Sequence, residues 1–144
     1  MVVWFIQFVY KTLCAISTRK KPSPRHQKKN PTYRDGRQEW YRHGRLHRED
    51  GPAVIYPNGS QWWYLHGEFH REDGPAHTTS DGYQAWYLNG KRHREDGPAV
   101  TYPDGKQAWY LHGVVHREDG PAVTYPNGKQ AWWIHGERYE VVSD

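Results

Sequence analysis

The chain of 144 residues is long enough for one domain, but its mean hydropathy of −1.09 excludes a thick globular core. Eight Trp and eleven Tyr argue against disorder, and the single cysteine, Cys14, excludes an internal disulfide framework and a thiolate metal cluster. The formal charge of +4 is unevenly divided, because residues 1–37 hold nine Lys/Arg and one acidic residue (+8), whereas residues 38–144 hold eleven Lys/Arg and fifteen acidic residues (−4).

Residues 1–17 form an apolar segment, for which we predict a short N-terminal helix or anchor. The run is shorter than the about 20 apolar residues of a transmembrane helix, and Lys11 interrupts it. Its basic flank follows the apolar run, whereas a secretory signal places positive charge before it. Four interpretations stay open: a helix that docks on a partner or membrane surface, a signal-anchor that keeps the repeats in the cytoplasm, an organelle-targeting segment, or a disordered or mis-assigned start. The side chains expected to make the contact are Trp4, Phe5 and Phe8.

Residues 18–32 contain three prolines and no large apolar side chain, which predicts a basic linker or arm. Simple solvation explains such a segment. The functional alternative is that residues 18–30 contact an anionic surface, either RNA or DNA phosphate or anionic lipid. No aromatic residue interrupts the basic cluster, so base stacking is not expected. The cations of this arm are Arg19, Lys20, Lys21, Arg25, Lys28 and Lys29.

A 23-residue repeat fills residues 33–144. The string His-Arg-Glu-Asp-Gly-Pro-Ala occurs four times, first at 47–53, and tryptophans and glycines keep the same period. The last unit loses this string, as is common for a terminal unit that caps an open end. The units are 40–62, 63–85, 86–108 and 109–131, followed by a capping half unit 132–144.

Each unit predicts a β-hairpin followed by a wide loop. Tyr-Pro-Asp-Gly-Lys at 102–106 is typical of a hairpin turn, in which proline presets φ and glycine supplies the left-handed step. Val100 should then lie opposite Ala108, and Thr101 opposite Gln107. A second tight turn reads His-Gly or Asn-Gly. We therefore predict an all-β fold, an elongated and twisted antiparallel hairpin repeat.

The aromatic columns are the expected repeat core. Strand alternation places tyrosines on one side of the sheet and tryptophans on the other, so we expect both faces to be partly covered. Some of these rings could instead form a groove for a peptide or a sugar. The residues predicted to form the repeat core are Trp40, Trp63, Trp86, Trp109, Trp132, Leu65, Leu88, Leu111 and Ile134.

Two histidine columns and the Arg-Glu-Asp triplets are the candidates for metal binding. Units spaced about 9.5 Å apart cannot share one zinc ion, whose ligand nitrogens lie about 2.0–2.1 Å away, so we expect structural histidines. The carboxylates could form a calcium ladder. We favour instead that aspartate caps each Asp-Gly-Pro bend while arginine pairs with the carboxylates of the adjacent unit. No cofactor is expected, and no recurring nucleophile and base suggest an enzyme.

The repeats resemble the MORN family. Asn-Gly-Lys-Arg-His at 89–93, followed by Tyr-Pro-Asp-Gly at 102–105, is similar to the two turns of that 23-residue hairpin unit. The resemblance covers about residues 33–140. The chain has Gln-Ala-Trp-Tyr-Leu in place of the usual Tyr-x-Gly-x-Trp and a longer loop, which is closer to the divergent MORN variants of bacteria and large DNA viruses. The resemblance implies a scaffold with interaction surfaces and no chemistry of its own.

These observations together predict a non-catalytic repeat scaffold, an interaction subunit of a larger assembly docked through its apolar and basic tail. Two alternatives stay open. One is a membrane-tethered protein with the repeats in the cytoplasm, and the other is an RNA- or DNA-associated structural protein that uses the basic arm. Unpaired strand edges also invite self-association. An intracellular location is favoured, with membrane or organelle association left open.

Overall fold

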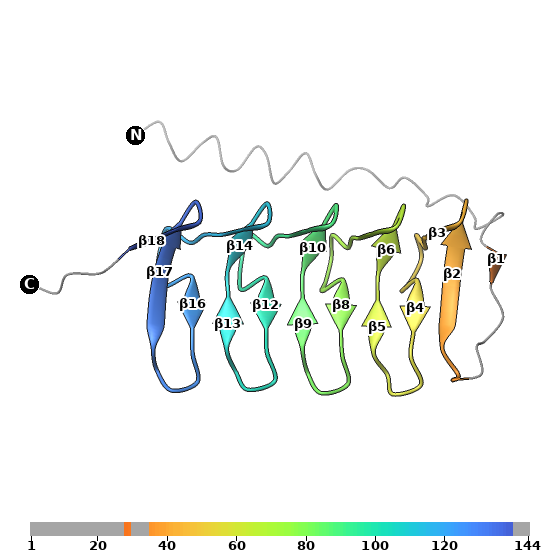
Figure 1. Cartoon of the computed structure of the whole chain (residues 1–144), viewed down its shortest axis with the longest axis horizontal. Helices are drawn as coiled ribbons and strands as arrows, with labels where there is room; N and C mark the ends of the chain where they lie inside the picture. The colour runs from red at the N-terminus through yellow and green to blue at the C-terminus, as the bar shows by residue number, and fades with distance from the viewer. Residues whose placement is uncertain (1–27, 30–34, 140–144) are drawn as a thin grey trace, which may run out of the picture.

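The computed structural model describes residues 28–29 and 35–139. Within these residues there is no helix, and the predicted all-β, elongated, antiparallel hairpin repeat is confirmed. The predicted helix at 1–17 and most of the linker at 18–32 lie outside the described residues. Figure 1 shows the repeat as a single row of hairpins, with long turns along one edge and tight turns along the other.

One 12-stranded sheet runs the length of the row. Its strands, in spatial order, are β1 (Lys28–Lys29), β2 (Gln38–Arg42), β4 (Val54–Ile55), β5 (Gln61–Trp62), β8 (His77–Thr78), β9 (Gln84–Ala85), β12 (Val100–Thr101), β13 (Gln107–Ala108), β16 (Val123–Thr124), β17 (Gln130–Ile134) and β18 (Glu137–Tyr139), with β3 (Arg45–Leu46) paired to β2.

Three two-stranded sheets form the tight-turn edge of the row. They are β6 (Tyr64–Leu65) with β7 (Glu68–Phe69), β10 (Tyr87–Leu88) with β11 (Lys91–Arg92), and β14 (Tyr110–Leu111) with β15 (Val114–Val115). Each hairpin bonds to the next, because the turn glycine of one unit donates its N–H to a carbonyl of the unit before; the Gly113 N–H, for example, lies 2.8 Å from the Arg92 oxygen.

The long turns have the predicted geometry. The Tyr102 N–H donates to the Lys106 carbonyl at 2.9 Å, and Asp104 Oδ1 accepts the Lys106 N–H at 2.9 Å. Val100 lies opposite Ala108, and Thr101 lies opposite Gln107, as the turn predicts. The turn therefore sets the register, and the register decides which side chains share a face.

The tight turns explain one histidine column. His43, His66, His112 and His135 have φ between 50° and 55°, and Asn89 takes their place in the remaining unit with φ 49°. The glycine that follows each of them also has a positive φ, so both central residues of the turn are left-handed, as a type I′ hairpin requires. These histidines adopt the left-handed backbone conformation that the turn needs, and asparagine is equally suited to that position.

The buried core is thin and made of alanine and valine. From β9 to β17 of the main sheet valine and alanine alternate across strands, so that Val100 lies between Ala85 and Ala108, and Val123 lies between Ala108 and Ala131. These residues are buried, and half-buried tyrosines pack on them. Small side chains suit this column because it is covered by one layer of rings rather than by a second sheet.

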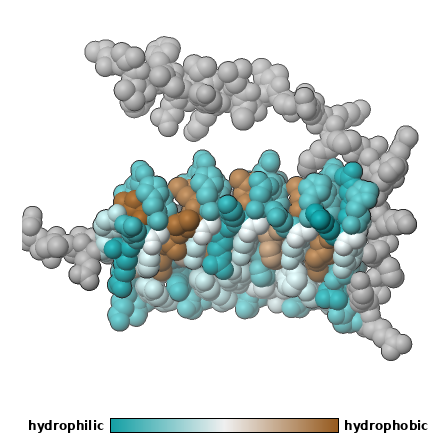
Figure 2. All heavy atoms as spheres, turned by 45° about the horizontal axis from the view of Figure 1, so that its top comes forward, coloured by the Kyte–Doolittle hydropathy of each residue, from teal (hydrophilic) through white to brown (hydrophobic). Residues whose placement is uncertain are grey.

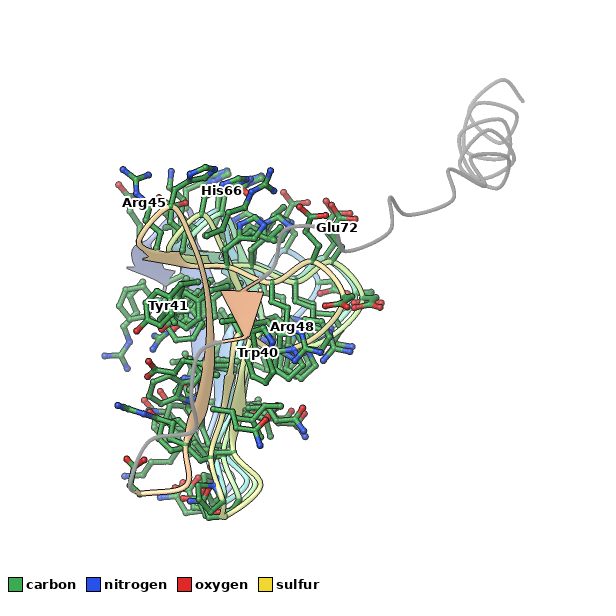
Figure 3. The ribbon with its side chains drawn as sticks, turned by 90° about the vertical axis from the view of Figure 1, so that its right-hand side faces the viewer. Trp40, Tyr41, Arg45, Arg48, His66 and Glu72 are labelled. Carbon is green, nitrogen blue, oxygen red and sulfur yellow. The ribbon has the colours of Figure 1, made fainter. Side chains whose placement is uncertain are left out.

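The sheet has two chemically different sides. We call the side of Tyr41 and the other tyrosines the tyrosine face, and the side of the His-Arg-Glu-Asp-Gly-Pro-Ala loops the loop face. The end-on view of Figure 3 shows Tyr41 on one side of the ribbon and Trp40, Arg48 and Glu72 on the other. In Figure 2 apolar patches recur along the row, separated by polar residues.

β1 adds one strand to the N-terminal end of the sheet. Lys28 and Lys29, which the sequence analysis assigns to the basic linker, pair with Tyr41 and Trp40 of β2. The last residues of that linker therefore extend the sheet, and their backbone covers the edge that this half of β2 would otherwise present.

Candidate functional site

The guanidinium of an arginine lies over a tryptophan ring in every complete loop. In the third unit the guanidinium carbon of Arg94 is 4.2 Å from the centroid of Trp86. Arg94 Nε donates to Asp96 Oδ1 at 2.9 Å, and Arg94 Nη1 donates to the Pro98 carbonyl at 3.4 Å. This tryptophan–arginine stack fastens the loop to the sheet by three contacts from one side chain. The same stack joins Arg48 to Trp40, Arg71 to Trp63 and Arg117 to Trp109.

The ion pairs of the loops lie within each unit. Arg94 binds Asp96 and Arg117 binds Asp119, in each case two residues along the same loop. Our prediction that these arginines pair with carboxylates of the adjacent unit is therefore wrong. The Asp-Gly-Pro bend turns the carboxylate back toward the guanidinium that precedes it. These hydrogen bonds to arginine lower the pKa of both Asp96 and Asp119.

The second histidine column connects successive units. His93 Nδ1 accepts the backbone N–H of His112, in the next unit, at 3.1 Å, and the two rings lie 4.5 Å apart. An Nδ1 that accepts a hydrogen bond carries no proton, so the neutral Nε2–H tautomer makes this contact. In the same way His47, His70 and His116 accept the backbone N–H of His66, Asn89 and His135, each in the unit that follows.

Open grooves lie between neighbouring loops on the loop face. The larger, of about 670 Å³, has Trp109 and Leu111 on its floor. Its walls carry Glu95 and Glu118, whose side chains are 83% and 78% exposed. The groove one unit earlier, of about 580 Å³, repeats this arrangement with Trp86 and Leu88. Each loop holds one arginine and two carboxylates, so the rims carry excess negative charge over an apolar floor.

The predicted repeat-core residues belong to this loop face. Trp40 is buried at 8% exposure, whereas the other members of the set are half-buried beside or beneath the loops. The fully buried column of alanine and valine was missed. The sequence does indicate this column, because Pro-Ala-Val and Gln-Ala recur in the repeats and place a small side chain at the same position of each strand. Of the predicted tail residues, all except Lys28 and Lys29 lie outside the described residues.

Contacting rings line the tyrosine face from Tyr56 to Tyr102. Phe69 stacks between Tyr64 and Tyr87, with ring centroids 4.2 and 5.0 Å away. Burial raises the pKa of Tyr64 to about 12. His77 stacks on Phe69 in place of the valine of other units, and burial together with the charge of Arg92 lowers the pKa of His77. Within the described residues His77 Nε2 is buried without a hydrogen-bond partner.

The first prediction concerns the tryptophan–arginine stack. Replacing Arg94 by Lys is expected to lower the free energy of unfolding by about 1–2 kcal/mol, because an ammonium cannot lie flat on Trp86 while also bonding Asp96 and the Pro98 carbonyl. Urea unfolding at neutral pH measures the loss. Arg138→Lys, at an exposed site, is the matched control, and equal midpoints for the two variants would contradict the role of the stack.

The second prediction concerns His77. Its pKa in the folded chain is lower than in the unfolded chain, so the unfolded state binds more protons and stability falls as the pH drops below about 6.5. Thermal unfolding between pH 5 and 8 should show a shallower pH dependence for His77→Val, which restores the residue found in other units. His112→Asn, which introduces the residue that the third unit has at that turn, should keep the parent slope. If His77→Val unfolded with the same pH dependence as the parent chain, His77 would not be its source.

No protein-family model matches the chain, and no curated protein sequence matches it. Within the described residues no helix is both long and apolar enough to cross a bilayer. The same residues contain no group of three His, Cys, Asp or Glu side chains placed to hold a metal ion.

Proposed function

We propose that the protein is a non-catalytic repeat scaffold, an interaction subunit whose loop face binds an extended, positively charged segment of a partner protein. The observation that carries this proposal is the groove between loops, with the same apolar floor and acidic rims in successive units. Equivalent sites spaced by one repeat engage a partner at several points, and this raises the overall affinity without any single strong contact.

The chemistry of the groove fits lysine and arginine side chains. Their alkyl stems can cover the Trp109 and Leu111 floor, while their charged ends reach the carboxylates of the rims. Glu95 and Glu118 are suited to this contact because they are exposed and are not part of the tryptophan–arginine stack. The aspartates of the same loops are already bound to arginine and help to shape the walls.

The third prediction tests the loop face with a labelled basic peptide that has the sequence of residues 18–30. We expect saturable binding to the full chain that weakens with salt. Glu95→Gln with Glu118→Gln should weaken it several-fold. Glu68→Gln with Glu137→Gln removes the same charge from the tight-turn edge and is the matched control. Fluorescence anisotropy measures the peptide affinity of both double variants. Equal losses of affinity would mean that net charge alone, and not the groove, explains the binding.

The tail is proposed as the second contact, which docks the scaffold in a larger assembly. Its support is the charge division, +8 before residue 38 and −4 after it, joined to an apolar run. The membrane-tethered and nucleic-acid-associated alternatives use the same tail, and they differ in what it contacts. An apolar contact depends on Trp4, Phe5 and Phe8, whereas a phosphate contact depends on the cations that follow.

The fourth prediction separates these contacts. Crosslinking mass spectrometry in a native extract should lose its tail-linked protein partners when Trp4, Phe5 and Phe8 are replaced by serine, because the apolar contact area is removed. Replacing Arg19, Lys20 and Lys21 by glutamine should weaken the same links without abolishing them. Unchanged partners in the serine variant would reject docking through the tail, and co-flotation of the parent chain with vesicles would favour the membrane alternative.

We further propose that the repeats are related to the MORN family. The support is that both motifs quoted for the resemblance are hairpin turns at the expected places: Asn89-Gly90 is a left-handed pair, and Tyr102 closes on Lys106. A relationship of this kind agrees with a scaffold role, since such repeats provide surfaces rather than chemistry.

A further inference from the structure

Departures from the repeat gather at one place on the tyrosine face. Arg92 occupies a position held by Leu46, Phe69 and Val115 in the preceding and following units. His77 replaces a valine, and Tyr83 stands where other units have serine, lysine or arginine. These substitutions lie together, since the ring centroids of His77 and Tyr83 are 5.1 Å apart and the charge of Arg92 contributes to the lowered pKa of His77. A fold built from near-identical units does not require this cluster.

Arg92 is half-buried among tyrosine hydroxyls. Its Nε donates to the Tyr87 hydroxyl at 3.3 Å, and its Nη1 donates to the Tyr110 hydroxyl at 3.3 Å. The guanidinium carbon also lies 5.2 Å from the centroid of the Tyr110 ring. Burial disfavours the charged form, but the hydroxyl of Tyr87 and the neighbouring tyrosines outweigh it, and the pKa of Arg92 is raised. Arg92 therefore remains a cation at any physiological pH.

Within the part of the chain that the structure describes, no carboxylate forms an ion pair with this cation. Among residues 35–139 every other arginine that is stacked on a ring has an acidic ion-pair partner, whereas Arg92 pairs with none. The carboxylates of the loops extend from the opposite side of the sheet, as Glu72 does in Figure 3. A charge that is partly removed from water without a counter-charge is costly, and an anion from solution or from a partner relieves that cost.

We propose that Arg92, with the hydroxyls of Tyr87 and Tyr110, binds a phosphate group. A guanidinium has five N–H donors, and the two tyrosines use two of them. Each hydroxyl that accepts an N–H keeps its own O–H to donate. The cluster thus offers the remaining N–H groups and two O–H groups to one acceptor. A tetrahedral phosphate group, with three or more free oxygens, can accept from more of these donors at once than a carboxylate with two oxygens, and the bonds from the guanidinium are charge-assisted.

This site is distinct from the loop face of the proposed function. The loop face presents carboxylates and fits cations, whereas the Arg92 cluster presents donors and fits an anion on the other side of the sheet. It is also single, because only one unit carries an arginine between two such tyrosines, whereas the grooves are repeated. Failure of one proposal therefore leaves the other standing.

Isothermal titration calorimetry of the full chain with inorganic phosphate, at constant ionic strength, tests the site. The parent should show one saturable phosphate site. Arg92→Leu, which copies Leu46, should weaken phosphate binding at least tenfold, whereas Arg138→Leu, one unit beyond Val115, should leave it unchanged. Acetate at the same ionic strength should not compete. Equal phosphate affinity in parent and Arg92→Leu would overturn the proposal, as would equal competition by acetate.

A milder pair of variants protects the test against misfolding. Tyr110→Phe removes one hydroxyl and keeps the ring, and it should weaken phosphate binding several-fold. Tyr64→Phe makes the same change in the second unit, where the neighbouring position holds Phe69 instead of arginine, and it should have no effect. If both variants bind phosphate as the parent does, the hydroxyls do not form a site, and the proposal is rejected whatever Arg92→Leu does.

Discussion

The stacking of one arginine on one tryptophan positions everything on the loop face. A loop of this length would otherwise have few reasons to adopt one conformation, since its backbone leaves the sheet and its side chains are charged. Arg94 removes that freedom by binding a ring, a carboxylate and a carbonyl at once. The fixed loop then holds His93 against the next unit and sets the walls of the grooves. The same guanidinium therefore determines the conformation of the loop, its contact with the next unit and the shape of the groove.

The two faces differ because strand alternation separates the residues of a single short strand. In Gln-Ala-Trp-Tyr-Leu, alanine and tyrosine belong to one side and tryptophan to the other. The tyrosine side needs small residues beneath its rings, which explains the buried column around Val100 and Ala108. The tryptophan side is covered by charged loops, so its rings are half-buried under arginine. One repeat thus supplies an aromatic row and an acidic, grooved surface with no second sheet.

The hairpins, their turns and their register follow from the sequence, because a Tyr-Pro-Asp-Gly turn fixes which residues lie opposite each other. The sequence does not predict which aromatic column forms the core. Strand alternation assigns the residues to two faces of the sheet, but it does not indicate what covers each face. The partner of Arg94 was misjudged for a related reason: spacing along the chain gives the distance between units but not the fold of a bend. The grooves depend on loop conformation, and no local pattern in the sequence reports their shape.

The first two units show where this architecture tolerates change. Trp62 occupies a position that is alanine in the later units and lies opposite His77 rather than valine. The bulk is accommodated because Tyr56, Phe69 and His77 all pack against the indole, with ring centroids 4.7 to 6.3 Å away. The exchange of several positions together keeps the face filled. The position of Arg92 on the tyrosine face is half-buried and holds leucine, phenylalanine, arginine or valine in successive units. A repeat of this kind can acquire a specific binding group there without disturbing the alanine and valine column beneath it.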